Sequence, residues 1–390
     1  MAGFTTFASG EQIKVVDMDS HYTEPPDLWT SRAPAKYKDL VPHVERTDAG
    51  DQWVVDGDKP FGPLGYTVVR LGGGKERGIA SLATFEELDV AAWDPKERLN
   101  LLDRLGIYQQ IVYPNVAGFG SEHFMDIPDR GLRLSCATIY NDAVAEIQAG
   151  SGGRLFPQAI IPFWDIDEAV AEVRRINDMG LKGVAMLDRP QEFGLPYLNE
   201  PHWAPFFATC EELQLPVNFH IGVLPVQTSQ RAVWPMQSMQ RMLAVSSIAL
   251  FMDNFKVITN LIFTGVLERY PNLKFVSVES GIGWIPFLLE AMDYQFEEAV
   301  PSDREGLTML PSEYFRRQMY ASFWFEDFGP RAAIDFIGAG NVMFETDFPH
   351  PTCLYPKAQE HIVEVLTDLD PETRRKILRN NAAEVYHLPD

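Results

Sequence analysis

The sequence predicts an α/β protein built as a (β/α)8 barrel of the TIM type, with a lid segment inserted after the first strand. Short apolar or β-branched runs alternate with helical patterns, and 390 residues are enough for eight such units. An open, doubly wound sheet is the alternative arrangement of the same elements. The eight predicted strands cover residues 13–16, 109–113, 157–161, 182–187, 216–219, 274–278, 318–323 and 342–344.

Start and stop signals bound the helices predicted between these strands. The first has Asp94 as its N-cap, Pro95 at its first position and Gly106 as its stop. The stretch DIDEAVAEVRRINDMGLKG has the apolar spacing of an amphipathic helix. The C-terminal tail repeats the Asp-Pro start at residues 370–371. Helices in these intervals favour parallel strands, since parallel strands need crossover connections.

Two insertions are expected within a single domain that spans residues 1–390. Residues 25–93 contain Pro-rich turns and a hairpin-like Asp56-Gly57, and they predict a flap or lid. Residues 227–256 predict a second, mostly helical insertion, which carries Trp234 and several methionines. The stretch RLGGGKERG lacks the Walker spacing and the flanking strand and helix of a phosphate loop, so no nucleotide site is expected there.

Composition excludes several classes of partner. The formal net charge is -22, which disfavours binding to nucleic acids and to acidic membrane surfaces. We find no uninterrupted run of 18 apolar residues and no signal-peptide pattern, so no membrane partner is expected. The three cysteines are far apart and odd in number, which fits a reduced, cytoplasmic protein.

Ligand-type side chains follow four of the predicted strands. Asp19 and His21 end the first, His220 the fifth, Glu279 the sixth and Asp347 the eighth. Because the strands of a barrel present their carboxyl ends at one face, these side chains are expected to converge there. Imidazoles and carboxylates suit Zn, Fe or Mn, as one or two ions. Each residue alone has an ordinary structural explanation, and Glu279 could simply cap the helix that follows it.

Such a centre would activate water or polarise a carbonyl group. Asp347 and His220 are candidate catalytic residues, with Asp347 holding the water and taking its proton. His350, three residues further on, could orient Asp347 or the substrate. Asp17 lies earlier on the same strand and is given no role.

Aromatic residues near the predicted strand ends suggest a pocket for a carbon-rich small molecule, although ordinary core packing would explain them equally well. The candidate pocket residues are Tyr113, His123, Trp164, Phe323 and Trp324.

The segments VVDMDSHYTEPPDLW, LPVNFHIG, YPNLKFVSVESGIGWIPFLLEAMD and VMFETDFPHP resemble the amidohydrolase superfamily. The similarity is to amidohydrolase-related family 2, the branch that includes aminocarboxymuconate-semialdehyde decarboxylase. It implies metal binding by Asp19, His21, His220 and Asp347, and it also implies a homo-oligomer, most often a dimer. Decarboxylating members of this family usually have a histidine where this chain has Glu279, so the resemblance leaves the reaction open.

On the basis of Glu279, the sequence favours a metal-dependent hydrolase that cleaves an amide, ester, lactone or thioester of a largely apolar substrate, with aromatic and polycyclic acid derivatives as candidates. The alternative is a metal-dependent non-oxidative decarboxylase of an aromatic or unsaturated carboxylic acid. A non-catalytic binding barrel is the remote alternative. Lys182 begins the fourth predicted strand, at the end away from the expected site, and is not assigned as a carbamylated bridge.

Overall fold

The computed structural model describes residues 3–62, 64–222, 234–235 and 238–390. The barrel strands are β3 (Val15–His21), β9 (Ile107–Tyr113), β10 (Leu155–Pro157), β11 (Ala159–Ile160), β12 (Val184–Ala185), β13 (Val217–His220), β14 (Phe275–Val278), β15 (Met319–Phe323) and β16 (Val342–Phe344). The helices are α1 (Pro95–Leu105), α2 (Arg130–Gly150), α3 (Ile166–Asp178), α4 (Ala204–Glu212), α6 (Met239–Phe251), α7 (Phe255–Phe263), α8 (Val266–Arg269), α9 (Ile285–Ala299), α10 (Pro311–Gln318), α11 (Ile334–Ile337), α12 (Ala358–Leu366), α13 (Pro371–Arg375) and α14 (Asn381–Val385).

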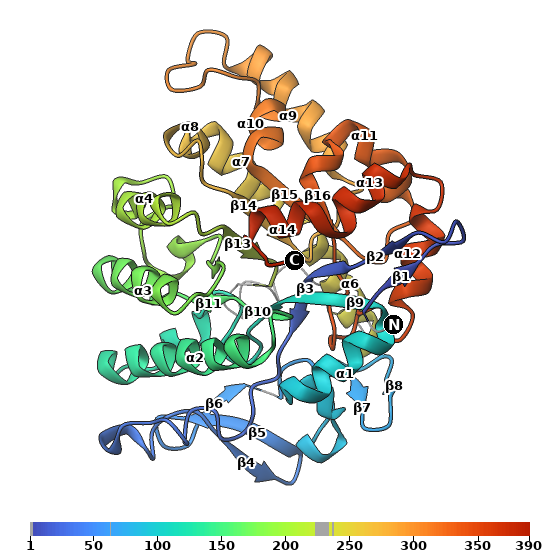
Figure 1. Cartoon of the computed structure of the whole chain (residues 1–390). Coiled ribbons are helices and arrows are strands. Elements are labelled where there is room, and N and C mark those ends of the chain that lie inside the picture. Colours follow the sequence, from blue (N-terminus) through green and yellow to red (C-terminus); the bar gives the residue numbers. More distant parts are fainter. Residues whose placement is uncertain (1–2, 63, 223–233, 236–237) are drawn as a thin grey trace.

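The parallel strands close into a barrel, which confirms the predicted fold class and rules out the open sheet (Figure 1). One sheet runs β10-β9-β3, and the other runs in chain order from β11 to β16. The barrel closes where β3 meets the segment after β16. The amide of Asp347 donates to Asp19 O at 2.9 Å, and Ser20 and Phe348 form an isolated parallel β-bridge. The third predicted strand is split at Gln158, whose amide donates back to Val112 O, so β10 pairs with β9 and β11 with β12.

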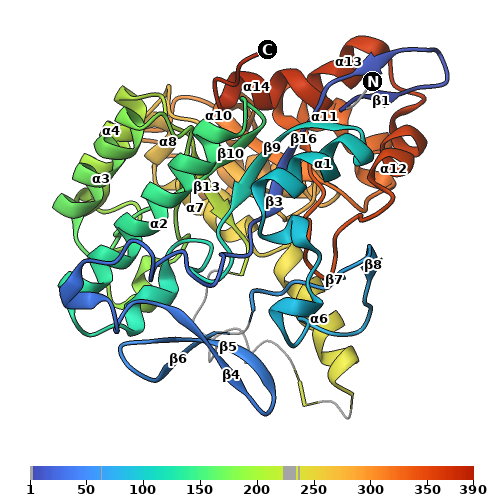
Figure 2. The ribbon, with the colours of Figure 1, turned by 60° about the horizontal axis from the view of Figure 1, so that its bottom comes forward.

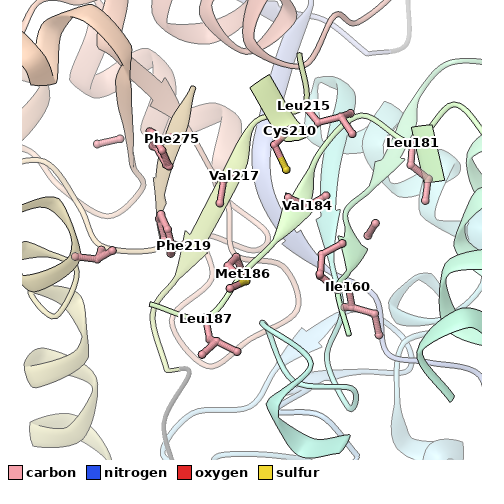
Figure 3. Packing of buried hydrophobic residues seen from close by; sticks show 14 of the residues in the cluster. Ile160, Leu181, Val184, Met186, Leu187, Cys210, Leu215, Val217, Phe219 and Phe275 are labelled. Atoms are coloured by element: carbon pink, nitrogen blue, oxygen red, sulfur yellow. The ribbon is translucent and has the colours of Figure 1, made fainter. Parts of the chain in front are cut away.

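Alternate residues of each barrel strand face the surrounding helices, and these side chains form the main core. Val217 and Phe219 of β13 pack with Phe275 of β14 and with Cys210 of α4 (Figure 3). The residues between them, Asn218 and the terminal His220, therefore face the barrel interior. The hydroxyl of Tyr386 donates to Asn218 Oδ1 at 2.6 Å, inside the barrel.

The caps of α1 are those expected from the sequence. The Asp94 carboxylate accepts a hydrogen bond from the Glu97 amide at 2.8 Å, and Pro95 is the first helical residue. Gly106 ends the helix with a φ of 71°, a left-handed conformation that glycine adopts without strain. The helix thereby stops one residue before β9 begins.

The insertion after β3 forms two small antiparallel sheets at one end of the molecule (Figures 1 and 2). The first contains β4 (His43–Thr47), β5 (Gly50–Val55) and β6 (Lys59–Gly62), and the second pairs β7 (Val69–Arg70) with β8 (Gly74–Lys75). RLGGGKERG therefore forms a hairpin, and the Lys75 ammonium donates to the carbonyl of Cys353. Whether the insertion acts as a lid, and the oligomeric state and cellular location, stay predictions. A separate two-stranded hairpin joins β1 (Thr5–Thr6) to β2 (Gln12–Ile13) near the N-terminus.

The second predicted insertion lies partly outside the described residues, and its described part contains α6. The segment Met239–Phe263 has the length and apolar composition of a membrane span, and 17% of its 18-residue apolar window is buried in the protein. A turn at residues 252–254 divides it into α6 and α7, and the buried side of α7 packs into the main core. The absence of a membrane partner stays a prediction.

Asn254 anchors this turn to the barrel. Its side-chain amide donates to Phe219 O and to Ser277 Oγ, both at 3.0 Å. Asn254→Ala should lower the free energy of unfolding by about 1–3 kcal/mol, since two buried acceptors lose their donor. Denaturant unfolding measures this change. Asn260→Ala is the matched control, because Asn260 is an exposed residue of α7, and an equal effect of both variants would contradict the anchoring role.

Candidate metal centre

Five buried side chains from four strand ends face one another at the carboxyl end of the barrel. Donor atoms of Asp19, His21, His220 and Glu279 all lie within 4.8 Å of one another. A second overlapping set joins His21 and Glu279 to Asp347 and to His350. The structure thus brings together every residue that the sequence nominated as a metal ligand.

Irregular backbone aims three of these side chains. The register of β3 against β9 shifts between Asp17 and Ser20, and Asp19 lies within this irregularity. Before it, the Asp17 carboxylate accepts from the Gln110 side chain at 2.8 Å and from the Thr346 amide at 2.8 Å. Simple alternation along β3 therefore does not hold, and Asp17 faces Gln110 and Thr346.

Glu279 and Asp347 have φ angles of 52° and 57°, in the left-handed region that non-glycine residues rarely adopt. Glu279 directly follows β14, and Asp347 lies three residues after the end of β16. At both positions this conformation changes the direction of the side chain. Strain of this kind concentrates at functional sites.

The two histidines present lone pairs to each other. His21 Nδ1 lies 3.1 Å from the carbonyl of Pro114, and His220 Nδ1 lies 2.7 Å from the carbonyl of Ile221. Because a carbonyl accepts, each Nδ1 carries the proton and each Nε2 is left as a lone pair. The two Nε2 atoms are only 3.2 Å apart. Two lone pairs at that distance repel each other unless a cation binds both.

Within the described part of the chain, the buried carboxylates of the cluster also lack a compensating positive charge. Neither oxygen of Asp19 has a hydrogen-bond partner among the described residues, although both are buried. Burial, together with the nearby Asp347 and Asp17, raises the pKa of Asp19, and burial, Asp347 and Asp19 raise that of Glu279. Burial lowers the pKa of His220 to about 4, so its imidazole is neutral and offers no compensating charge. A divalent ion bound by nitrogen and oxygen donors would satisfy all these groups.

His350 and Asp347 form a pair beside this cluster. His350 Nδ1 lies 2.9 Å from Asp347 Oδ1, and His350 Nε2 lies 3.1 Å from Asn115 Oδ1. The ring of His350 stacks on that of His21, with 3.7 Å between ring centroids. The hydroxyl of Thr352 donates to the other oxygen of Asp347. Both nitrogens of His350 thus lie close to side-chain oxygens, of Asp347 on one side and of Asn115 on the other.

Glu279 does not cap the helix that follows it. The turn that precedes α9 is held by Glu326, whose carboxylate accepts from the amides of Ile282 at 3.1 Å and Gly283 at 2.7 Å, and α9 itself has no side-chain cap among the described residues. Glu279 Oε2 instead lies 3.5 Å from His220 Nε2. The sequence offered no signal for Glu326, which lies 44 residues further along the chain.

Glu279→Gln should therefore weaken metal binding by at least about tenfold, because an amide oxygen is a poorer ligand than a carboxylate. Elemental analysis after dialysis and titration of the apo protein with Mn²⁺ measure the change. Glu326→Gln is the matched control, since it alters a carboxylate beside the same turn without touching the cluster. Equal metal affinity in both variants would exclude Glu279 as a ligand.

A cavity of about 270 Å³ opens onto the cluster, and Glu279 and His350 line it. Its apolar wall comes mainly from α6 and from the loop after β9, through residues Phe119, Ile221, Leu243, Leu250 and Phe251. The Phe119 ring covers the imidazoles, at 4.2 Å from that of His220 and 4.9 Å from that of His21. This size suits a single-ring ligand, at the lower end of small-molecule pockets.

Of the five aromatic and histidine residues expected in the pocket, only His123 lines this cavity. Tyr113 lies in the barrel interior, 5.4 Å from the His220 ring, and Trp164 donates to Glu168 on α3. Phe323 and Trp324 are fully buried. Strand-end side chains alternate between the barrel interior and the helix layer, so most of these aromatics pack as core.

Asn115 and Phe119 line the cavity without having been identified from the sequence. The sequence could have indicated them only by their position, because both lie in the loop directly after the second barrel strand, β9.

Comparison with known proteins corrects the expected reaction. The chain is 24% identical over 305 residues to 2-amino-3-carboxymuconate-6-semialdehyde decarboxylase of Dictyostelium discoideum. The aligned region covers 78% of this chain and 79% of that protein. Gamma-resorcylate decarboxylases are among its other relatives. Hydrolysis, favoured because of Glu279, is therefore the wrong choice. A carboxylate at this position is compatible with a metal centre and does not by itself indicate hydrolysis.

Solved structures show the same fold. An amidohydrolase from Mycobacterium avium subsp. paratuberculosis superposes with a TM-score of 0.75 at 22% identity, covering 96% of this chain and 99% of that one. A 5-carboxyvanillate decarboxylase from Novosphingobium aromaticivorans, complexed with manganese, superposes with a TM-score of 0.62 at 20% identity. That superposition covers 76% of this chain and 82% of that one. The model of the amidohydrolase family matches residues 16–388. With its closed barrel and its buried cluster of metal-ligand side chains, the chain belongs to the amidohydrolase family.

Proposed function

We propose that this protein is a metal-dependent, non-oxidative decarboxylase that acts on an aromatic or unsaturated carboxylic acid. The observation that carries the proposal is the pair of facing Nε2 lone pairs beside the unpaired carboxylate of Asp19, at the base of a small, largely apolar cavity. The decarboxylase relatives support this reaction class. Manganese is the proposed metal, because carboxylate-rich sites suit it and the Novosphingobium decarboxylase contains it.

The reaction replaces a carboxylate by hydrogen. A proton is added to the carbon that bears the carboxylate, with a π electron pair of the substrate forming the new C–H bond. The bond to the carboxylate then breaks, its electron pair restores the π system, and carbon dioxide leaves. The substrate supplies the electrons, so neither an oxidant nor a reductant is consumed. A bound divalent ion would hold substrate oxygens and draw electron density from them.

The protein's own residues supply the proton and position the acid. Asp347 is the proposed proton donor, with His350 beside it as the group that replenishes the proton. Asn115 is 1% exposed, and its Nδ2 has no partner among the described residues although it belongs to the cavity lining. We assign this amide to the substrate carboxylate, because a buried donor without an acceptor is costly.

The Phe119 ring restricts water at the same place. Its position over both imidazoles leaves an apolar surface beside the carboxylate to be lost. Such surroundings favour conversion of an anion into neutral carbon dioxide.

The test is release of carbon dioxide from a panel of hydroxylated benzoic acids and unsaturated acids by the full chain loaded with Mn²⁺ or Zn²⁺. We expect at least one acid to yield stoichiometric carbon dioxide and the product with hydrogen in place of the carboxylate. Chelated enzyme is the control and should be inactive. A metal-loaded enzyme that leaves every acid of such a panel intact would contradict the proposal.

A further inference from the structure

The cavity contains a second polar group, outside the metal cluster. Glu122 and His123 lie in a short 3-10 helix, Glu122–Asp126, and line the cavity together with Glu279 and His350. Neither residue belongs to the two sets of candidate metal ligands. The sequence nominated His123 as a pocket residue but gave Glu122 no role.

Glu122 is held rigidly by the loop that precedes it. Its Oε2 accepts the amide of Gly120 at 2.9 Å, and the residue is 6% exposed. A Cβ atom on Gly118 would lie 2.5 Å from the same oxygen, so the loop backbone wraps closely around the carboxylate. The carboxylate is thus fixed in place while it faces the cavity.

The other oxygen is available to a ligand. Glu122 Oε1 has His123 Nε2 as its near neighbour, at 3.9 Å, which is too far for a hydrogen bond. His123 Nδ1 lies 2.8 Å from the carbonyl of Val116, so that nitrogen donates and Nε2 presents a lone pair. The cavity therefore offers two neighbouring acceptors, and no described side chain donates to either.

The described lining residues include no lysine or arginine. A second carboxylate on a ligand would meet Glu122 without a described cation to compensate it, whereas a hydroxyl or amino group would supply the donor that both acceptors lack. Selectivity of this kind rests on the cost of unpaired buried polar groups.

We propose that Glu122 is a specificity-determining residue, which with His123 selects a ring carboxylic acid bearing a hydroxyl or amino donor and disfavours a dicarboxylic acid. The inference rests on the proposed function, because it places the substrate's own carboxylate at the metal centre. A hydrogen bond to a charged acceptor corresponds to about a 10- to 100-fold gain in affinity.

The test is calorimetric titration of the Mn²⁺-loaded full chain with benzoate, meta-hydroxybenzoate, meta-aminobenzoate and isophthalate, which share one ring and differ in one substituent. We expect the hydroxy or amino acid to bind about 10- to 100-fold more tightly than benzoate, and isophthalate to bind more weakly than benzoate. Glu122→Gln preserves the side-chain volume and an acceptor for the Gly120 amide. In this variant both differences should shrink to within about threefold. Glu326→Gln is the control and should keep the wild-type ranking.

Two results would overturn the inference. One is tighter binding of isophthalate than of benzoate by the wild-type protein, a measurement that does not depend on any variant folding. The other is an unchanged ranking in folded Glu122→Gln protein. A third result separates the two proposals. If the four acids bind in the expected order of affinity but no acid releases carbon dioxide, the proposed function is contradicted and the assignment of Glu122 is supported.

Discussion

Replacing His220 with alanine should remove the metal and abolish turnover while the chain stays folded. His220 supplies one of the two facing Nε2 atoms, and the alanine variant leaves His21 as the sole imidazole lone pair directed at the centre. Loss of a direct ligand should weaken metal binding by more than about 100-fold, because even replacing a residue that only supports a ligand lowers metal affinity by about 10- to 100-fold. Metal content by elemental analysis and carbon dioxide release measure the two effects, with circular dichroism as the check on folding.

His202→Ala is the matched control for this prediction. His202 lies on the short helix Pro201–Trp203, where its ring packs against Trp203 and not against the cluster. The control should keep its metal and its activity. Full metal content and wild-type turnover in His220→Ala would remove His220 from the centre and undermine the metal assignment as a whole.

Asp347→Asn should lower kcat by about 10²–10⁴-fold, the range for loss of a general acid or base. Asparagine preserves the shape and still accepts from Thr352, but it cannot carry the proton that the proposed mechanism assigns to Asp347. Steady-state kinetics with the acid identified by the panel, at full metal occupancy, measures the loss. A change confined to KM would show that Asp347 binds the substrate and does not transfer a proton.

Asp188→Asn controls for the loss of a buried carboxylate at a strand end. Asp188 follows β12 and pairs with the Arg189 guanidinium at 2.8 Å, away from the cluster. Its replacement should leave kcat unchanged. An equal loss of kcat in both variants would point to a general effect on the barrel.

The metal centre could be predicted because strand ends converge in any closed parallel barrel. Apolar runs located the strands, and the polar residues that end them, such as His220 and Asp347, had to meet at one face. Alternation alone would have grouped Asp17 with Asp19, since nothing in the sequence identifies the irregularity in β3. Local backbone conformation decides which way each of these carboxylates points.

The cavity could not be predicted in the same way. Its walls come from the loop after β9 and from α6, and neither segment has a periodic pattern that places its side chains relative to the barrel. Residues such as Phe119 and Glu122 reach the cavity through tertiary packing of loops. Trp164 and Phe323 lie closer to the carboxyl ends of the predicted strands, yet both pack as core. The chemistry also depended on the relatives, because Glu279 is compatible with more than one reaction.

The left-handed backbone at Glu279 and Asp347 has a consequence for how this protein can change over time. Residues other than glycine pay about 1–3 kcal/mol to hold such a conformation, so glycine at either position would relieve strain. Random variants selected only for heat resistance should accordingly accumulate glycine at these two positions, and the survivors would be stable barrels without activity. Selection for thermostability and selection for catalysis would therefore act on these two positions in opposite directions.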